Sequence, residues 1–153
     1  VCSTTLPQLA IPRIYGDPRY LGLMNDRAKM FEKRSNQVYD YFKNNVPGVI
    51  VHRTQGAFYF CVTFEDGVLS DKQTPPIANP TVRAMVENGV KGQPLDKRFV
   101  YYMMGSDGVC VTPLTGFHTD INGFRLTTLR PDDVARGEIL ERIGSCIRRY
   151  TGV

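Results

Sequence analysis

The sequence predicts an α+β domain, in which a small, mostly antiparallel β-sheet carries α-helices on one side. Apolar residues recur at helical spacing over residues 21–42 and again over residues 140–150. Between them lie short runs of β-branched and aromatic residues, at 49–64 and 123–129, that are typical of strands. The chain has 153 residues, 42% of them hydrophobic and 22% charged, which suits one folded domain with a core of its own.

The predicted helix that contains residues 21–42 is unusually long. Asp17 can cap its start, Pro18 suits a first helical turn, and Pro47-Gly48 ends it. Apolar or small residues recur in steps of three and four along one stripe: Leu21, Met24, Ala28, Phe31, Ser35, Val38 and Phe42. Such a helix either packs on the core of its own domain or bridges to another part of a larger structure, and the pattern leaves both open. Residues 1–18 are expected to be irregular, because prolines interrupt them.

Two strands are predicted next, at 49–53 (VIVHR) and at 57–64 (AFYFCVTF), joined by a short hairpin connection at 54–56. Both faces of the second strand are apolar or aromatic, so we expect it near the centre of the sheet. Residues 65–96 are punctuated by proline and glycine, which indicates a long loop with at most one short helix, around 80–88.

The last part of the chain is predicted to hold a helix at 95–108, a strand at 109–114, a strand at 123–129 and a terminal helix that opens at Pro131. Acidic residues lie in the first turn of the terminal helix and arginines in its last turn, as the helix dipole favours. One face of this helix carries an apolar stripe: Leu140, Ile143, Ile147 and Tyr150.

Several classes of site are not indicated. The net charge is a modest +4 without a basic stripe, which argues against nucleic-acid binding, and no apolar run is long enough to span a membrane. The cysteines are too widely spaced for a zinc site, and we expect reduced thiols in a cytoplasmic protein, with Cys61 and Cys110 buried in their strands. The two histidines, His52 and His118, are far apart, and no metal site is expected.

Arg125 stands out, because it is a permanently charged side chain inside an apolar strand, GFRLTTL at 123–129. It can be an edge-strand arginine that pairs with a nearby carboxylate, such as Asp120 or Asp132. It can also be held rigidly by the strand, with its planar guanidinium directed at a carboxylate that arrives from solvent. The pattern of residues alone does not decide between these two roles.

Three segments in order resemble a known family: GAFYF at 56–60, GVCVTPLTGFH at 108–118 and GFRLTTL at 123–129. They resemble the C-terminal small domain of class I/II aminotransferases, the fold-type I enzymes that use pyridoxal 5'-phosphate, and most closely the alanine and aromatic branch. The resemblance covers nearly all of the chain. It implies that Arg125 binds the α-carboxylate of the amino-acid substrate.

The resemblance also implies that a large domain is missing. None of the six lysines has the sequence context of the family's cofactor-binding lysine, and residues 2–8 (CSTTLPQ) resemble the stretch that follows it. Residues 1–18 are thus expected to be the tail of the large domain or a linker, and residues 19–153 the small domain. We expect no catalytic residue and no cofactor-binding residue in this chain.

For the full-length enzyme, the resemblance implies a homodimer that transfers the amino group of an amino acid to a 2-oxo acid through pyridoxal phosphate. The chain alone is expected to bind no cofactor tightly and to be inactive. Exposed apolar surface is expected on the long helix and on residues 1–18, where the large domain and a second subunit would dock. Two alternatives are a pyridoxal-phosphate lyase or synthase of the same superfamily and a freestanding binding module without catalysis.

Overall fold

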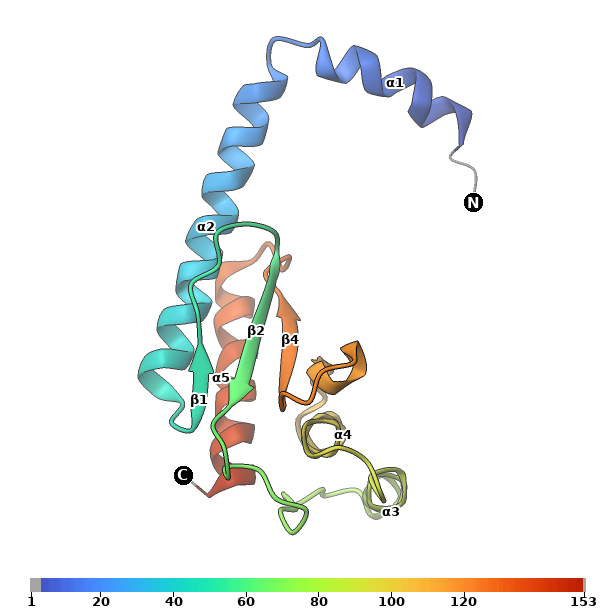
Figure 1. Cartoon of the computed structure of the whole chain (residues 1–153), viewed down its shortest axis with the longest axis vertical. Helices are drawn as coiled ribbons and strands as arrows, with labels where there is room; N and C mark the ends of the chain where they lie inside the picture. Colours follow the sequence, from blue (N-terminus) through green and yellow to red (C-terminus); the bar gives the residue numbers. More distant parts are fainter. Residues whose placement is uncertain (1–3, 153) are drawn as a thin grey trace.

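The computed structural model describes residues 4–152 and confirms the α+β class (Figure 1). Four strands form one antiparallel sheet in the order β1-β2-β4-β3. The elements in chain order are α1 (Thr5–Tyr15), α2 (Tyr20–Asn45), β1 (Val49–Val51), β2 (Tyr59–Phe64), α3 (Pro80–Gly89), α4 (Leu95–Asp107), β3 (Thr112–Pro113), the 3-10 helix η1 (Leu114–Phe117), β4 (Gly123–Thr127) and α5 (Asp133–Thr151).

One face of the sheet carries the core. Phe60, Val62 and Phe124 point from β2 and β4 toward the helices and are fully buried, because side chains alternate along a strand. Rings from different elements meet there: Phe124 lies 6.2 Å from Phe42 of α2 and 5.8 Å from Phe99 of α4, measured between ring centroids. Helices α2, α4 and α5 therefore share one core with the sheet, as predicted.

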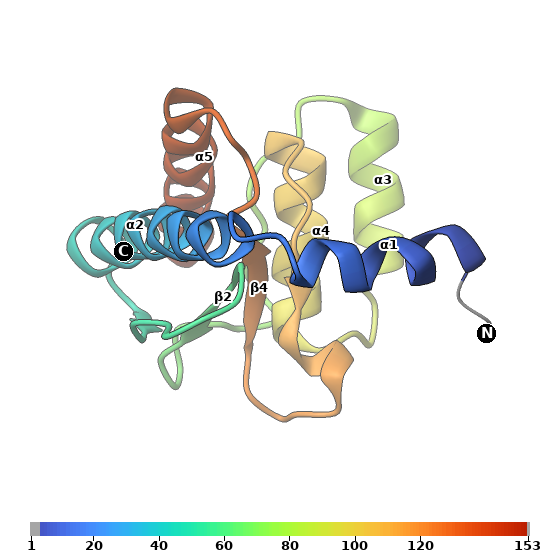
Figure 2. The ribbon, with the colours of Figure 1, turned by 90° about the horizontal axis from the view of Figure 1, so that it is seen from above.

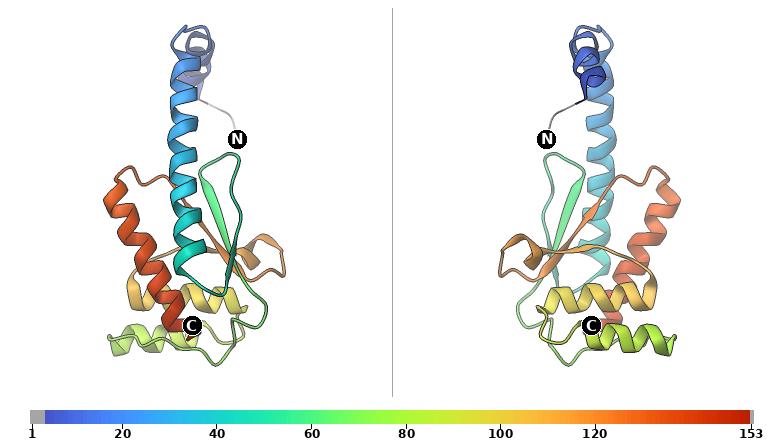
Figure 3. Two further views of the ribbon diagram at one scale, coloured as in Figure 1. Left: turned by 90° about the vertical axis from the view of Figure 1, so that its left-hand side faces the viewer. Right: turned by 90° about the vertical axis from the view of Figure 1, so that its right-hand side faces the viewer.

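Helix α2 divides into a buried half and an exposed half. Its buried residues are Arg34, Ser35, Val38 and Phe42, whereas every residue from 21 to 30 is exposed. Figures 1 and 3 show the first half extending well beyond the rest of the domain. The apolar stripe thus covers the core only over its second half, and Leu21 remains 72% exposed.

The prediction that residues 1–18 are irregular is wrong for most of the segment, because α1 is helical over Thr5–Tyr15. Pro7 lies in the first turn, where no N–H is needed, and one internal proline, Pro12, is accommodated. Residues 1–3 lie outside the described part of the chain. No residue of α1 is buried, and Figure 2 shows α1 leaving the end of α2 at a wide angle, so this segment does not complete the core.

The remaining elements match the predictions, with three corrections. Asp17 does not cap α2: its N-cap is Arg19, without a side-chain cap hydrogen bond, and Pro18 precedes the helix. The hairpin connection runs over 52–58 rather than 54–56, and Ala57 adopts a left-handed conformation in it. The strand predicted at 109–114 is reduced to Thr112–Pro113, because residues 109–111 form no ladder with β4 and the chain turns into η1 after Pro113. Helices α3 and α5 begin at side-chain caps, Asn79 and Asp132, each of which accepts two backbone N–H groups.

None of the helices within residues 4–152 combines the length and apolar character that a membrane span requires.

Candidate functional site

Arg125 lies in the middle of β4, between two neighbouring strands. Its direct partners across the sheet are Cys61 of β2 and Thr112 of β3. Directly opposed residues of antiparallel strands project from the same face, so all three side chains leave the face that is turned away from the core. Tyr59 of β2 lies two residues before Cys61 on the same face and is exposed. Arg125 itself is half-buried.

Two aromatic rings enclose the guanidinium of Arg125. Its Cζ lies 4.2 Å from the centroid of the Tyr59 ring and 4.5 Å from the centroid of the Phe117 ring, which η1 supplies. Both contacts are within cation–π range. These ring contacts leave the N–H groups of Arg125 available to a hydrogen-bond acceptor.

No hydrogen bond or ion pair of the Arg125 side chain is found within residues 4–152. The buried arginines behave differently: Arg34 donates to the carbonyls of Thr128 and Pro131, and Arg136 donates to Gln37 and Asp133. Among the described residues, Arg125 forms an ion pair with neither of the predicted partners, Asp120 and Asp132, and Asp132 accepts two backbone N–H groups as the N-cap of α5. A guanidinium has five N–H donors in a rigid plane, a geometry that matches a carboxylate.

The loop that carries Phe117 is fixed by a side chain that the sequence analysis did not single out. Asp96, in the first turn of α4, has 0% exposure and accepts hydrogen bonds from the backbone N–H of Thr115 at 2.9 Å and from its hydroxyl at 2.6 Å. At the other end of the loop, the N–H of Gly123 lies 3.5 Å from the same carboxylate. The signal in the sequence was an acidic residue three positions before Phe99, within an otherwise apolar helical face.

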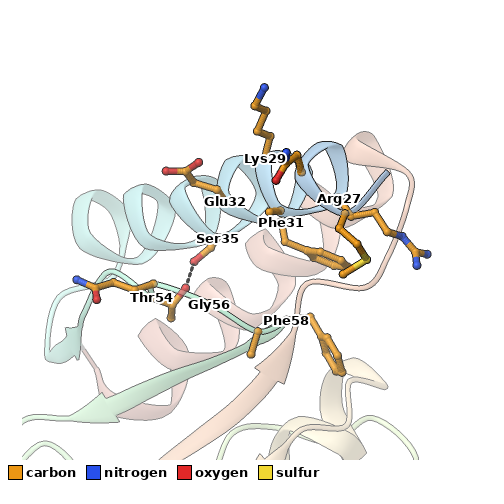
Figure 4. A pocket seen from close by; sticks show the side chains of 13 residues that line it. Arg27, Lys29, Phe31, Glu32, Ser35, Thr54, Gly56 and Phe58 are labelled. Atoms are coloured by element: carbon orange, nitrogen blue, oxygen red, sulfur yellow. Dashed lines mark hydrogen bonds between the residues drawn. The ribbon is translucent and has the colours of Figure 1, made fainter. Parts of the chain in front are cut away.

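A groove of about 730 Å³ lies beside this site, between α2 and the 52–58 connection (Figure 4). Ser35 and Thr54 join its two walls through a hydrogen bond between their hydroxyl groups. Phe58 lines the groove, and its ring centroid lies 4.6 Å from that of Tyr59. The groove thus adjoins the rings around Arg125, although Arg125 does not line it.

The predicted burial of Cys61 and Cys110 is wrong. Both thiols are free and exposed, and only Cys146 of the three described cysteines is buried. Cys61 is exposed because it points from the uncovered face of the sheet, beside Arg125. Cys2 lies outside the described residues. Within the described part of the chain, no group of three or more His, Cys, Asp or Glu side chains is placed to hold a metal ion.

The largest pKa shifts belong to groups of the core. Burial raises the pKa of the Cys146 thiol to about 12, and burial also raises the pKa of Tyr150 to about 12. Burial and a hydrogen bond to Glu141 raise the pKa of Tyr41 to about 12. These three groups are therefore neutral at pH 7.

None of the six lysines is buried: Lys97 is half-buried and the other five are exposed. A lysine that forms a Schiff base with pyridoxal phosphate needs an enclosed site with groups for the ring and the phosphate. The described residues of this chain therefore do not fit such a cofactor site.

Comparisons with known proteins bear on the family. No family model matches the chain. It is 47% identical over 133 residues to an uncharacterized aminotransferase of Methanocaldococcus jannaschii, a match that covers 87% of this chain and 31% of that protein. The chain thus spans about a third of the length of this curated relative.

Solved structures agree on the fold. The chain is similar to an aspartate aminotransferase of Rhizobium meliloti, with a TM-score of 0.61 and 23% identity, over 83% of this chain and 27% of that one. An aspartate aminotransferase of Rhodobacter sphaeroides gives a TM-score of 0.55 and 19% identity, over 87% of this chain and 26% of that one. In sequence and in fold, this chain is therefore a relative of part of an aminotransferase.

Proposed function

We propose that this chain is the C-terminal, substrate-binding part of a pyridoxal-phosphate-dependent aminotransferase, and that Arg125 binds the α-carboxylate of the amino acid. The observation that carries the proposal is the state of the Arg125 guanidinium. It is held between the rings of Tyr59 and Phe117, and it has no hydrogen-bond acceptor in the described part of the chain.

A guanidinium that is held by ring contacts and has free N–H groups is preorganised to bind an anion. Ring contacts restrict its movement, so less conformational entropy is lost when a ligand binds. A carboxylate can accept two parallel N–H groups from its edge, which fixes both the position and the orientation of the bound amino acid. In an aminotransferase this would hold the α-carbon at the place where the reaction occurs.

The cofactor would be bound by a large domain that this chain does not contain. Pyridoxal phosphate supplies the electron sink for amino-group transfer, and we assign no step through it to residues of this chain. The length of the curated relative supports this, because about two thirds of that protein has no counterpart here. Amino acids and 2-oxo acids would be the substrates of the complete enzyme.

The surface for the large domain would be α1 and the first half of α2. Apolar side chains lie exposed along both helices, for example Leu6 at 77% and Leu21 at 72%. Isolated apolar side chains are common on surfaces, but here they continue along α1 and the exposed first half of α2. A freestanding module would have no use for such a surface, which favours the enzyme part over that alternative. A homodimer and a cytoplasmic location remain predictions.

Kinetics of the full-length protein that contains this segment will test the role of Arg125. Arg125→Lys keeps the charge but loses the two parallel N–H groups, and a charged hydrogen bond is worth about 1.5–3 kcal/mol, so kcat/KM is expected to fall about tenfold to a hundredfold. Arg142→Lys, at an exposed arginine of α5 away from this site, is the matched control and should leave the rate unchanged. Normal kcat/KM for Arg125→Lys would end the proposal. Analysis of the products separates transamination from lyase chemistry.

A further inference from the structure

Asp96 is a buried carboxylate whose partners all belong to one loop. It has no ion-pair partner among residues 4–152, and its oxygens accept the N–H and hydroxyl of Thr115 and face the N–H of Gly123. Its own backbone N–H is directed at the side chain of Asn122, at 3.3 Å. The carboxylate therefore joins α4 to both ends of the segment 114–123.

Stability alone gives little reason for this arrangement. A buried charge has a large desolvation cost, and apolar residues of similar volume often stabilise a core better. The carboxylate instead fixes the position of the loop, because its two oxygens accept hydrogen bonds from donors at defined places in the loop. A surface loop of this length would otherwise move freely.

Both ends of the loop lead directly to Arg125. Phe117 lies two residues after Thr115 and places its ring 4.5 Å from the Cζ of Arg125. Gly123 begins β4 two residues before Arg125. Its position is tight, since an added Cβ would lie 2.5 Å from the carbonyl oxygen of Val62 and 2.8 Å from the side chain of Leu114.

We infer that Asp96 is a positioning residue for the carboxylate site. It holds the Phe117 ring against the Arg125 guanidinium and thereby sets the direction of the guanidinium's free N–H edge. Asp96 does not touch Arg125, and it acts through Thr115 and the loop. The functional half of this inference rests on the proposed role of Arg125 in binding the substrate carboxylate.

The structural half can be tested in the chain itself by NMR. The Cζ of Arg125 lies over two rings, so ring currents should displace the proton resonance of its Nε–H upfield. Asp96→Asn places an NH2 group against N–H donors and should move this resonance back toward its ordinary position. Thr115→Val, which loses only the hydroxyl, should move it in the same direction, whereas Thr115→Ser should restore it.

Asp132→Ala is the matched control for general destabilisation, because it removes the cap of α5 and touches no part of the loop. Its Arg125 resonance should stay in place. If Asp96→Asn does not fold, comparison of the Arg125 resonance in Thr115→Val and Thr115→Ser tests the inference instead. A folded Asp96→Asn or Thr115→Val variant with an unmoved Arg125 resonance would overturn the inference.

The functional half needs the full-length enzyme and two substrates, an amino acid and the amine with the same side chain but no carboxylate. Thr115→Val should raise KM for the amino acid about tenfold, since a misplaced clamp loses orientation, and should leave the amine unaffected. A purely structural defect would weaken both substrates alike and would overturn the positioning role. If the Arg125 resonance moves but the preference for the amino acid does not, positioning of Phe117 stands and the proposed function of Arg125 fails.

Discussion

Cys61 and Arg125 lie directly opposite each other in β2 and β4, and their side chains share the uncovered face of the sheet. Opposed residues in antiparallel strands have Cβ atoms about 4.5–5.5 Å apart. A group attached to the Cys61 sulfur is therefore within reach of the Arg125 guanidinium.

This neighbourhood predicts the effect of thiol reagents. Cys61 and Cys110 should react, because both are exposed, whereas the buried Cys146 should not react. Iodoacetate would place a carboxylate beside Arg125, and iodoacetamide would place a neutral amide of nearly the same size there. The Arg125 Nε–H resonance should respond more strongly to iodoacetate. Peptide mapping and NMR check this, and Cys61→Ser should abolish the difference between the two reagents.

Removal of residues 1–18 should leave the stability of the domain almost unchanged, because α1 has no buried residue. We expect the free energy of unfolding to change by less than about 0.5 kcal/mol, as for other changes away from the core. Phe42→Ala is the comparison: this ring is 0% exposed and its loss should cost about 3–5 kcal/mol. Denaturant unfolding measures both. A large loss on truncation would contradict the domain boundary at residue 19.

Gly123→Ala should destabilise the fold. The new Cβ would lie 2.5 Å from the carbonyl oxygen of Val62, so β4 must move away from β2. Overpacking of this kind costs about 1–3 kcal/mol. Gly137→Ala, in α5, is the matched control, because nothing lies within 4 Å of its added Cβ. The control should be neutral or should raise the free energy of unfolding by about 0.5–1 kcal/mol, since alanine is the better helix former.

Acid should weaken the contact between α4 and α5. Burial of Asp107 raises its pKa, but hydrogen bonds from Ser106 and Arg149 outweigh burial, and the pKa falls below its usual 3.8. A lowered pKa in the folded state means that the stabilisation is present above the unfolded value and disappears as the pH falls through the folded value. Denaturant unfolding at decreasing pH should show this loss, and Asp107→Asn should reduce it. The exposed Asp26→Asn serves as control, and an equal effect of both variants would contradict the assignment.

Sequence reasoning found most of the elements because their signals are local. The stripes of α2 and α5 and the apolar run of β2 depend on neighbouring residues alone. It also singled out Arg125, because a charge inside an apolar strand is conspicuous in any sequence. The sequence does not predict helix α1, because its prolines indicate interruptions, although one of them, Pro7, lies in the first turn.

The surroundings of Arg125 could not be predicted in the same way. Tyr59 and Phe117 reach it from another strand and from a 3-10 turn, and Asp96 acts on it through a loop. Such contacts depend on tertiary structure, to which periodicity and propensity give no access. The exposure of Cys61 was missed for a related reason: its strand is apolar on both faces, but the face from which Cys61 points is exposed in the described part of the chain.

Helix α2 can also be regarded as a mechanical lever. Its 26 residues form one uninterrupted helix about 39 Å long. The second half is clamped in the core of the domain that bears Arg125, and the first half projects freely. A rotation of the clamped end by about 5° would displace the free end by about 2 Å, given a projecting length of roughly 20 Å. A domain or subunit that binds the projecting half is therefore coupled rigidly to the orientation of the Arg125 site.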